Sequence, residues 1–150
     1  MRAVIQRVSE ASVEINNKLV AEINKGFLIL LGIEIDDTLE DVIWLSNKIS
    51  QLRIFSDEDG KMNNSIIEVD GNAIVVSQFT LHAKTKRGNR PSYIKAAKAQ
   101  QAIPLYEEFI ENLSNTLGKK IQSGEFGADM KVILLNDGPV TIIIDTKNKE

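Results

Sequence analysis

The stretch IVVSQFTL, residues 74–81, is the one around which the rest of the chain is organised. Its first half is an unbroken β-branched run, which is typical of a strand buried in a core. Its second half changes to hydroxyl, amide, aromatic and hydroxyl side chains. A strand whose end turns polar in this way is expected to reach the surface at a site.

Composition excludes several classes of chemistry and structure. The 150 residues predict a single domain, 1–150, and 43% hydrophobic with 26% charged residues is ordinary for a globular protein. With no cysteine and one histidine, disulfides, thiolate chemistry and a histidine-rich metal site are excluded, and no cofactor motif is present. No run is long enough for a membrane span and no signal-peptide profile opens the chain, so a cytoplasmic protein is expected, without membrane contact.

Charge is distributed unevenly along the chain. The net charge of −3 argues against bulk nucleic-acid binding. Between residues 83 and 106, however, there is no acid, and the cations of that segment are Lys84, Lys86, Arg87, Arg90, Lys95 and Lys98. Such a local basic face fits focused contact with a few phosphates, whereas the plainer interpretation is a solvated, lysine-rich loop and helix.

Hydrophobic periodicity predicts an α+β fold with largely antiparallel sheets of barrel or sandwich type and two main helices. A helix is expected over 39–51, and a second from Pro91-Ser92, interrupted and restarted at Pro104 and stopping near Gly118. The tail 146–150 is expected to be frayed. Strands are expected at 2–9, 11–15, 19–23, 27–31, 53–55, 65–69, 74–81, 130–135 and 140–145.

The polar strand end offers the first candidate residues. Side chains alternate along a strand, so Gln78, Thr80 and His82 are predicted to share one face. The amide and hydroxyl of Gln78 and Thr80 could then orient a carbonyl or a sugar hydroxyl. In the alternative, which the residues alone favour, Thr80 is simply a good strand residue and Gln78 lies in solvent. His82 is expected to be exposed on a loop and not to act as a base.

The segment Asn136-Asp137-Gly138-Pro139 offers a second candidate. It is either a plain hairpin turn or a place of close backbone approach, because glycine has no side chain and proline has no N–H. A Gly-Pro bond can also be cis, which would aim two carbonyl oxygens in unusual directions.

Four segments together resemble the D-aminoacyl-tRNA deacylases. These are SQFTL (77–81), NDGPVT (136–141), MRAVIQRV (1–8) and FGADM (126–130), in the order and spacing of that family over nearly the whole chain. The resemblance implies an enzyme that hydrolyses the ester between a D-amino acid and the terminal adenosine of tRNA, and that also acts on glycine mischarged on tRNA. It also implies a homodimer with no cofactor, in which a cis Gly138-Pro139 bond reaches into the partner's pocket and Arg7 holds that turn.

The same resemblance assigns roles to the remaining candidates. Gln78 and Thr80 would belong to the catalytic site, and the residues implied to bind substrate are Ser77, Phe79, Ala102, Phe126 and Met130. The reaction has two candidate drivers, Thr80 as a nucleophile or the ribose 2′-hydroxyl next to the ester, and the absence of charged residues from the motifs favours the second. A non-catalytic RNA-binding module and a structural dimeric β-protein are the competing interpretations.

Overall fold

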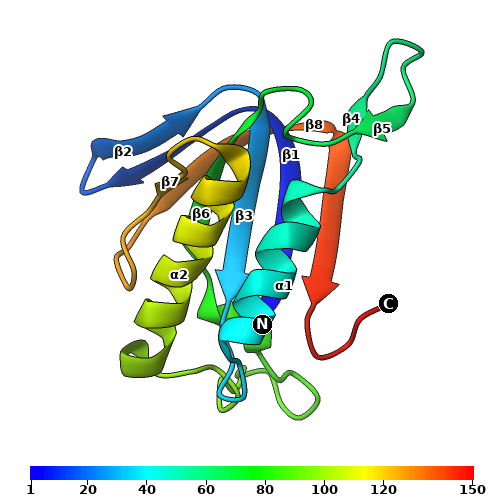
Figure 1. Cartoon of the computed structure of the whole chain (residues 1–150). Coiled ribbons are helices and arrows are strands. Elements are labelled where there is room, and N and C mark those ends of the chain that lie inside the picture. The colour runs from blue at the N-terminus through cyan, green and yellow to red at the C-terminus, as the bar shows by residue number, and fades with distance from the viewer.

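The long first strand, β1 (Arg2–Ile15), is the element to which most of the sheet is attached. The computed structural model describes residues 1–150. On one side, β1 pairs antiparallel with β3 (Gly26–Gly32) along its first half and with β2 (Lys18–Ile23) along its second half. On its other side it pairs with β8 (Lys131–Asp145) along almost its full length (Figure 1). The two strands expected at 2–9 and 11–15 are therefore one.

The sheet is mixed: the pairings around β1 are antiparallel, as expected, but two others are parallel. Beyond β3 the order continues with β6 (Asn72–Ser77) and β7 (Gln122–Ser123), and both of these pairings are parallel. The sheet then curls back toward β2, where the backbone N–H of Glu22 donates to the side-chain oxygen of Gln122 over 2.8 Å. The result is a nearly closed barrel, with β8 as its outer edge strand.

Two helices cover one face of this sheet (Figure 1). Helix α1 (Leu39–Ser50) forms as expected, and it begins at a capping box in which the N–H of Thr38 donates to the Asp41 carboxylate over 2.9 Å. Helix α2 (Ala99–Leu117) ends, as expected, at Gly118 in the left-handed conformation. No helix of the chain is long and apolar enough to cross a membrane.

The predicted start of α2 at Pro91-Ser92 is wrong, as is the predicted interruption at Pro104. Residues before Ala99 form an extended loop instead, because their backbone groups bond to other segments: Lys84 exchanges two hydrogen bonds with Ser92, and the N–H of Ala97 donates to Ile33 over 3.0 Å. Pro104 lies inside the helix. Its ring costs only one hydrogen bond near the N-terminal end, and the packing of the helix outweighs that loss.

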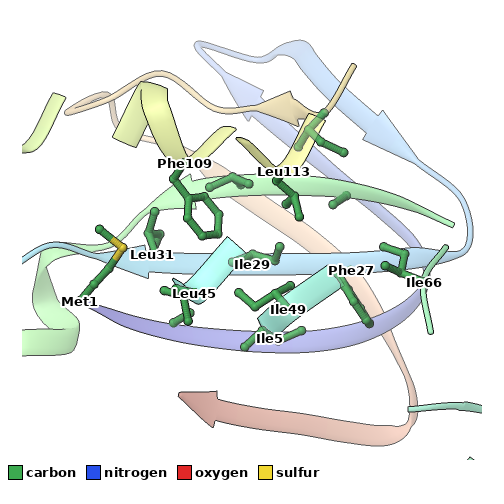
Figure 2. Packing of buried hydrophobic residues seen from close by; sticks show 14 of the residues in the cluster. Met1, Ile5, Phe27, Ile29, Leu31, Leu45, Ile49, Ile66, Phe109 and Leu113 are labelled. Atoms are coloured by element: carbon green, nitrogen blue, oxygen red, sulfur yellow. The ribbon is translucent and has the colours of Figure 1, made fainter. Parts of the chain in front are cut away.

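Hydrophobic residues form two clusters, one on each face of the sheet. The larger lies between the sheet and the helices, where Phe27, Ile29 and Leu31 of β3 meet α1 and α2 (Figure 2). The smaller lies inside the curl of the barrel and takes the alternate residue Leu28 together with Ile74 and Val76 of β6. Because β3 and β6 are buried on both faces, their sequences do not alternate between apolar and polar residues. Each fully buried aliphatic side chain contributes about 1.5–3 kcal/mol to the free energy of folding.

The predicted short strands near residues 53 and 65 are only partly confirmed. A two-stranded hairpin forms from β4 (Phe55–Ser56) and β5 (Met62–Asn64). Residues 65–69 form a turn and not a strand, because the carboxylate of Glu68 accepts hydrogen bonds from both the N–H and the hydroxyl of Ser65.

The end of the chain departs from the predicted hairpin and from the frayed tail. Strand β8 is continuous through residues 136–139, where a turn was predicted. The extra residues appear as register shifts in the pairing with β1, on either side of Val8. Beyond it, the N–H of Thr146 donates to the carbonyl of Met1 over 2.9 Å, and Lys147 Nζ donates to the Asp41 carboxylate over 2.8 Å. These contacts with the first residue and with α1 hold the start of the tail in place.

Candidate functional site

A pocket of about 280 Å³ opens where β3 and β6 end. Most of its wall is apolar, and it is closed on one side by the start of α2 and on another by the loop that leads into β8. The residues that line it are Leu31, Ile33, Val76, Ser77, Gln78, Phe79, Ala97, Ala102, Phe126, Gly127, Ala128, Asp129, Met130 and Val132. All five predicted substrate-binding residues and Gln78 are therefore brought together at one place.

The polar segment after β6 does not continue as a strand. The last hydrogen bond between this segment and β3 runs from the N–H of Gln78 to the carbonyl of Leu31 over 2.8 Å. Residues Phe79–His82 then form a short 3₁₀ helix, η1. The predicted shared strand face of Gln78, Thr80 and His82 is therefore wrong. The amide and the hydroxyl still meet, because Gln78 Nε2 donates to Thr80 Oγ1, but Thr80 lies beside the pocket and not among its lining residues.

His82 is buried, so the expectation of an exposed loop histidine is wrong. The 3₁₀ turn directs its ring inward, where only 4% of the residue is exposed and Nδ1 lies 3.5 Å from Glu34 Oε2. The ring packs against Gly32, at which a Cβ would lie 3.1 Å from His82 Cδ2 and 2.9 Å from the carbonyl oxygen of Gln78. His82, the last residue of η1, therefore anchors that short helix against β3. It is not among the residues that line the pocket.

The aromatic wall of the pocket is held in place by a buried tyrosine. Phe126 packs edge-on against Tyr106 with ring centroids 5.7 Å apart, and the Tyr106 hydroxyl donates to the carbonyl of Val75 over 2.8 Å. Burial raises the pKa of Tyr106 to about 12, although a hydrogen bond with Ser123 acts in the opposite direction. Tyr106 thus stays a neutral donor. From the sequence it is visible only as one member of the apolar stripe of α2.

A glycine fixes the position of Met130. A Cβ at Gly124 would collide with Met130 Sδ, so the side chain lies where that of residue 124 would otherwise be. Nothing in the sequence pattern singles out Gly124 for this contact. The only charged side chain that lines the pocket is Asp129, and no group of three or more histidine, aspartate or glutamate residues gathers anywhere in the chain to hold a metal ion.

The mouth of the pocket carries exposed aromatic rings. Phe79 is 53% exposed, and its ring meets that of Tyr93 edge-on with centroids 4.9 Å apart. Tyr93 belongs to the loop that carries the basic segment, and none of the cations between residues 83 and 98 is paired with a carboxylate. Tyr93 was not among the candidates predicted from the sequence. Its signal was an aromatic residue within an acid-free basic segment.

Gly138, Pro139 and Arg7 lie apart from this pocket. The Gly138-Pro139 peptide bond is cis, and both residues are exposed on β8. Arg7 is nearly buried beneath them and donates from Nε to the carbonyl of Asp137 over 2.9 Å and from Nη1 to that of Ile54 over 2.6 Å.

Asn136 also supports this segment, and sequence reasoning gave it no role of its own. Its side-chain oxygen accepts from the N–H of Val140 over 2.8 Å, and its amide donates to Thr141 Oγ1 over 3.0 Å. The segment is therefore fastened at both ends, by Arg7 and by Asn136, while Gly138 and Pro139 project between them.

Fold and site together define a class: a small α+β domain with an apolar pocket at the end of a barrel, bordered by main-chain and amide groups and facing a basic loop. Residues 4–145 match the model of the D-Tyr-tRNA(Tyr) deacylase family. The chain belongs to this family.

Individual relatives agree with the family assignment. A protein of Bacteroides fragilis named D-aminoacyl-tRNA deacylase is 65% identical over 150 residues, all of both chains, and one of Flavobacterium johnsoniae with the same name is 63% identical over the same extent. A solved structure named "c-Myc DNA Unwinding Element Binding Protein" is 39% identical, with a TM-score of 0.93, and the match covers 97% of this chain and 99% of that one.

A more distant solved structure supports the fold alone. It is described as that of "a probable eukaryotic D-amino acid tRNA deacylase" and is 17% identical, with a TM-score of 0.82 over 95% of this chain and 97% of that one.

Proposed function

We propose that the protein hydrolyses the ester bond of D-aminoacyl-tRNA to give free D-amino acid and tRNA. The observation that carries this proposal is the pocket lined by Ser77, Gln78 and Phe79, with unpaired cations on the loop that follows. The relatives that share the whole length of the chain bear the name of this activity. An aminoacyl group enters the pocket, and the polyanion to which it is attached lies along the basic loop.

The size of the pocket suits one amino acid. Its volume of about 280 Å³ is just below the roughly 300–1,000 Å³ of sites that hold drug-sized ligands. The apolar wall accepts side chains of different kinds without specific hydrogen bonds. Selection must then depend on chirality at the α-carbon and not on the identity of the side chain.

Chiral selection is assigned to Gly138-Pro139 of a second copy of the chain. In one copy these residues do not line the pocket, and they project from β8 with Arg7 fixing the preceding carbonyl. If the segment enters the pocket of a partner, its main-chain carbonyl oxygens accept hydrogen bonds from the substrate amine and occupy the space of an L side chain. Rejection by a clash of this kind applies to every L-amino acid, whereas glycine, which has no side chain, is accepted.

The catalytic step is assigned to the RNA and not to a protein nucleophile. Thr80 Oγ1 accepts a hydrogen bond from Gln78 Nε2, and the structure places neither a histidine nor a carboxylate in hydrogen-bonding contact with it. The ribose 2′-hydroxyl next to the ester activates water, while the protein positions the ester and stabilises the oxyanion with backbone N–H groups near Phe79 and Thr80.

Two substrates test the function. Purified protein is incubated with D-tyrosyl-tRNA and with L-tyrosyl-tRNA, and release of the amino acid is followed. Rapid loss of the D ester with the L ester spared is expected. Loss of both esters would contradict the chiral filter, and loss of neither by folded protein would contradict the enzyme. Glycyl-tRNA in the same assay is expected to be hydrolysed.

Two changes test the catalytic step. A D-tyrosyl-tRNA that ends in 2′-deoxyadenosine is expected to be hydrolysed far more slowly than the normal substrate. Thr80→Ala, in contrast, is expected to retain most of the turnover. Near-complete loss of turnover in Thr80→Ala with substrate binding intact would instead support Thr80 as the nucleophile.

Mixing two inactive variants tests the shared site. Phe79→Ala damages the pocket, and Gly138→Val damages the projecting segment, so each homodimer is expected to be inactive. Mixed dimers contain one pocket in which both parts are intact, and activity is therefore expected to return after the two variants are denatured together and refolded. The control is the Phe79→Ala variant denatured and refolded without the second variant. Absence of recovery despite mixed dimers would place both parts in one copy.

One alternative has a specific observation in its favour. The 39% identical structure is named for binding a DNA element, which favours a nucleic-acid-binding module without catalysis. That alternative predicts that tRNA binds and the ester persists, so the assay on D-tyrosyl-tRNA separates the two.

A further inference from the structure

We infer that Tyr93, with Lys84 and Lys95, binds the nucleotide that precedes the terminal adenosine of the tRNA substrate. The inference rests on the proposed function, because that function brings the 3′ end of an RNA to the pocket. It adds a second contact outside the pocket, for a base and a phosphate that take no part in the reaction.

The first observation is an exposed aromatic corner. Tyr93 and Phe79 are exposed by 37% and 53%, and their rings meet at an interplanar angle of 74°. Two exposed ring surfaces set almost at right angles do not suit two bases stacked on one another. They suit two successive bases that have been splayed apart, as happens when a single-stranded RNA end is turned into a site. Phe79 lines the pocket, which leaves Tyr93 for the base before the last.

The second observation is that the backbone holds Tyr93 and two cations in one arrangement. Lys84 and Ser92 exchange hydrogen bonds of 2.8 and 3.0 Å, which places Lys84 beside the residue next to Tyr93. The carbonyl of Lys95 accepts from the N–H of Ile35 over 3.1 Å, which ties the other side of Tyr93 to the segment after β3. The aromatic ring is therefore presented by a loop that is fixed on both sides.

The third observation is a second hollow, of about 190 Å³, that Lys84 and Lys95 share with Arg2, Glu34, His82 and Ala83. Arg2 is paired with Asp145 at 2.7 Å, and Glu34 Oε2 lies 3.5 Å from His82 Nδ1. Glu34 is the only carboxylate that lines the hollow, against the three cations Arg2, Lys84 and Lys95. Neither Lys84 nor Lys95 is paired with a carboxylate. An anion that enters this hollow meets two unpaired ammonium groups next to Tyr93, and the phosphate that joins the last two nucleotides of an RNA is such an anion.

Together these features predict that the enzyme gains affinity from more of the tRNA than its last residue. Stacking of one base on an aromatic side chain corresponds to about 5- to 150-fold in affinity. Because this contact lies outside the pocket, it is made equally before and during the reaction. It therefore lowers KM without changing kcat.

The test compares two substrates and three proteins. D-tyrosyl-tRNA contains the preceding nucleotide, and D-tyrosyl-adenosine lacks it. Tyr93→Ala is expected to raise KM for the tRNA about 5- to 150-fold, with kcat unchanged, and to leave both parameters for the adenosine ester as in the wild type. Tyr93→Phe keeps the ring, and because the Tyr93 hydroxyl forms no hydrogen bond within the protein, this variant is expected to match the wild type on both substrates. An equal loss on both substrates would show that Tyr93 only supports Phe79, and no loss on either would show that no base stacks there; both results overturn the inference.

Salt dependence tests the two lysines. The affinity for deacylated tRNA is measured at several salt concentrations, and its logarithm is plotted against the logarithm of salt concentration. The double variant Lys84→Ala, Lys95→Ala is expected to reduce the magnitude of the slope by about 0.7, the value for one single-strand phosphate. Lys61→Ala, on the distant loop between β4 and β5, is the matched control and should leave the slope unchanged. An unchanged slope in the double variant would overturn the phosphate contact. Because this measurement uses deacylated tRNA, it does not depend on catalysis. If the wild type hydrolysed neither ester, that result would refute the proposed function and leave the test of the phosphate contact valid.

Discussion

At the residue scale, Gly138 shows how one missing side chain allows the projecting segment to exist. Its φ of +132° is a conformation that L residues rarely adopt, and a Cβ there would lie 2.8 Å from Arg7 Nη2 and 2.9 Å from Val140 Cγ2. The same guanidinium group fixes the preceding carbonyl. A side chain at residue 138 would therefore displace the group that holds the segment.

Gly138→Ala is accordingly expected to lower the free energy of unfolding by about 1–3 kcal/mol and to reduce deacylation sharply. Gly60→Ala, in the loop between β4 and β5, is the matched control, because Gly60 also has a positive φ, +77°, but a Cβ there would meet nothing within 4 Å. Chemical denaturation and the D-tyrosyl-tRNA assay give the two readouts. Equal effects of the two substitutions would mean that backbone strain, and not the contact with Arg7, is what matters.

Tyr106 supplies a prediction about alkaline pH. Burial raises its pKa from 10.0 to about 12, so the unfolded chain loses the phenol proton at a lower pH than the folded chain does. The stability that this group contributes is therefore fully present below pH 10 and is lost as the pH rises toward 12, by up to about 1.4 kcal/mol per pH unit. Tyr106→Phe is expected to be less stable than the wild type at pH 8 and to show a shallower decline above pH 10 in urea titrations. Parallel declines would contradict this role for Tyr106.

At the element scale, patterns of apolar residues predicted the helices and the buried strands better than the segments between them. The helix at 39–51 followed from its spacing and its capping residues, and the runs at 27–31 and 74–77 are strands buried on both faces. The change from strand to 3₁₀ helix after Gln78 had no such signal, because the alternation of residue types expected for a strand continues in the sequence as far as His82. Apart from the polar strand end, the predicted pocket residues could be named only by resemblance, since the pocket is built from four separate segments, 31–33, 76–79, 97–102 and 126–132.

Helix α1 depends on the chain terminus for part of its stability. Burial alone would raise the pKa of Asp41, but hydrogen bonds from Lys147, Thr146 and the backbone of Thr38 outweigh it and hold that pKa well below its usual range. A depressed pKa means that the stabilisation is present above the ordinary carboxyl value near 4 and is lost as the pH falls below it.

Asp41→Asn is therefore expected to cost about 1–2 kcal/mol at pH 7, through the lost capping box and ion pair, and clearly less at pH 2.5. The urea midpoint at the two pH values measures this difference. Asp59→Asn, in the exposed loop between β4 and β5, is the control and should change neither midpoint. A cost that is the same at both pH values would show that the charge of Asp41 is not what stabilises the helix.

At the scale of the whole molecule, the arrangement around β1 sets where the fold is most resistant to opening. Residues 2–6 and Val8 of β1 are paired on both sides, by β3 and by β8, and Ala3 and Ile5 are fully buried. The β4–β5 hairpin has one short pairing and projects from the body of the protein (Figure 1). Hydrogen exchange is expected to be slowest at β1 and β3 and fastest at β4–β5. Comparable exchange in both regions would contradict this order of stability.

The position of β1 and β8 at opposite ends of the chain has a consequence for biosynthesis. The ribosome makes β1 first and β8 after every other element, at about 5–20 residues per second. Until then one whole edge of β1 has no partner, and an unpaired apolar edge invites association with another nascent chain. Molecular chaperones that shield exposed strands would act on this protein throughout its translation, and translation that stalls before residue 131 would release a product prone to aggregate.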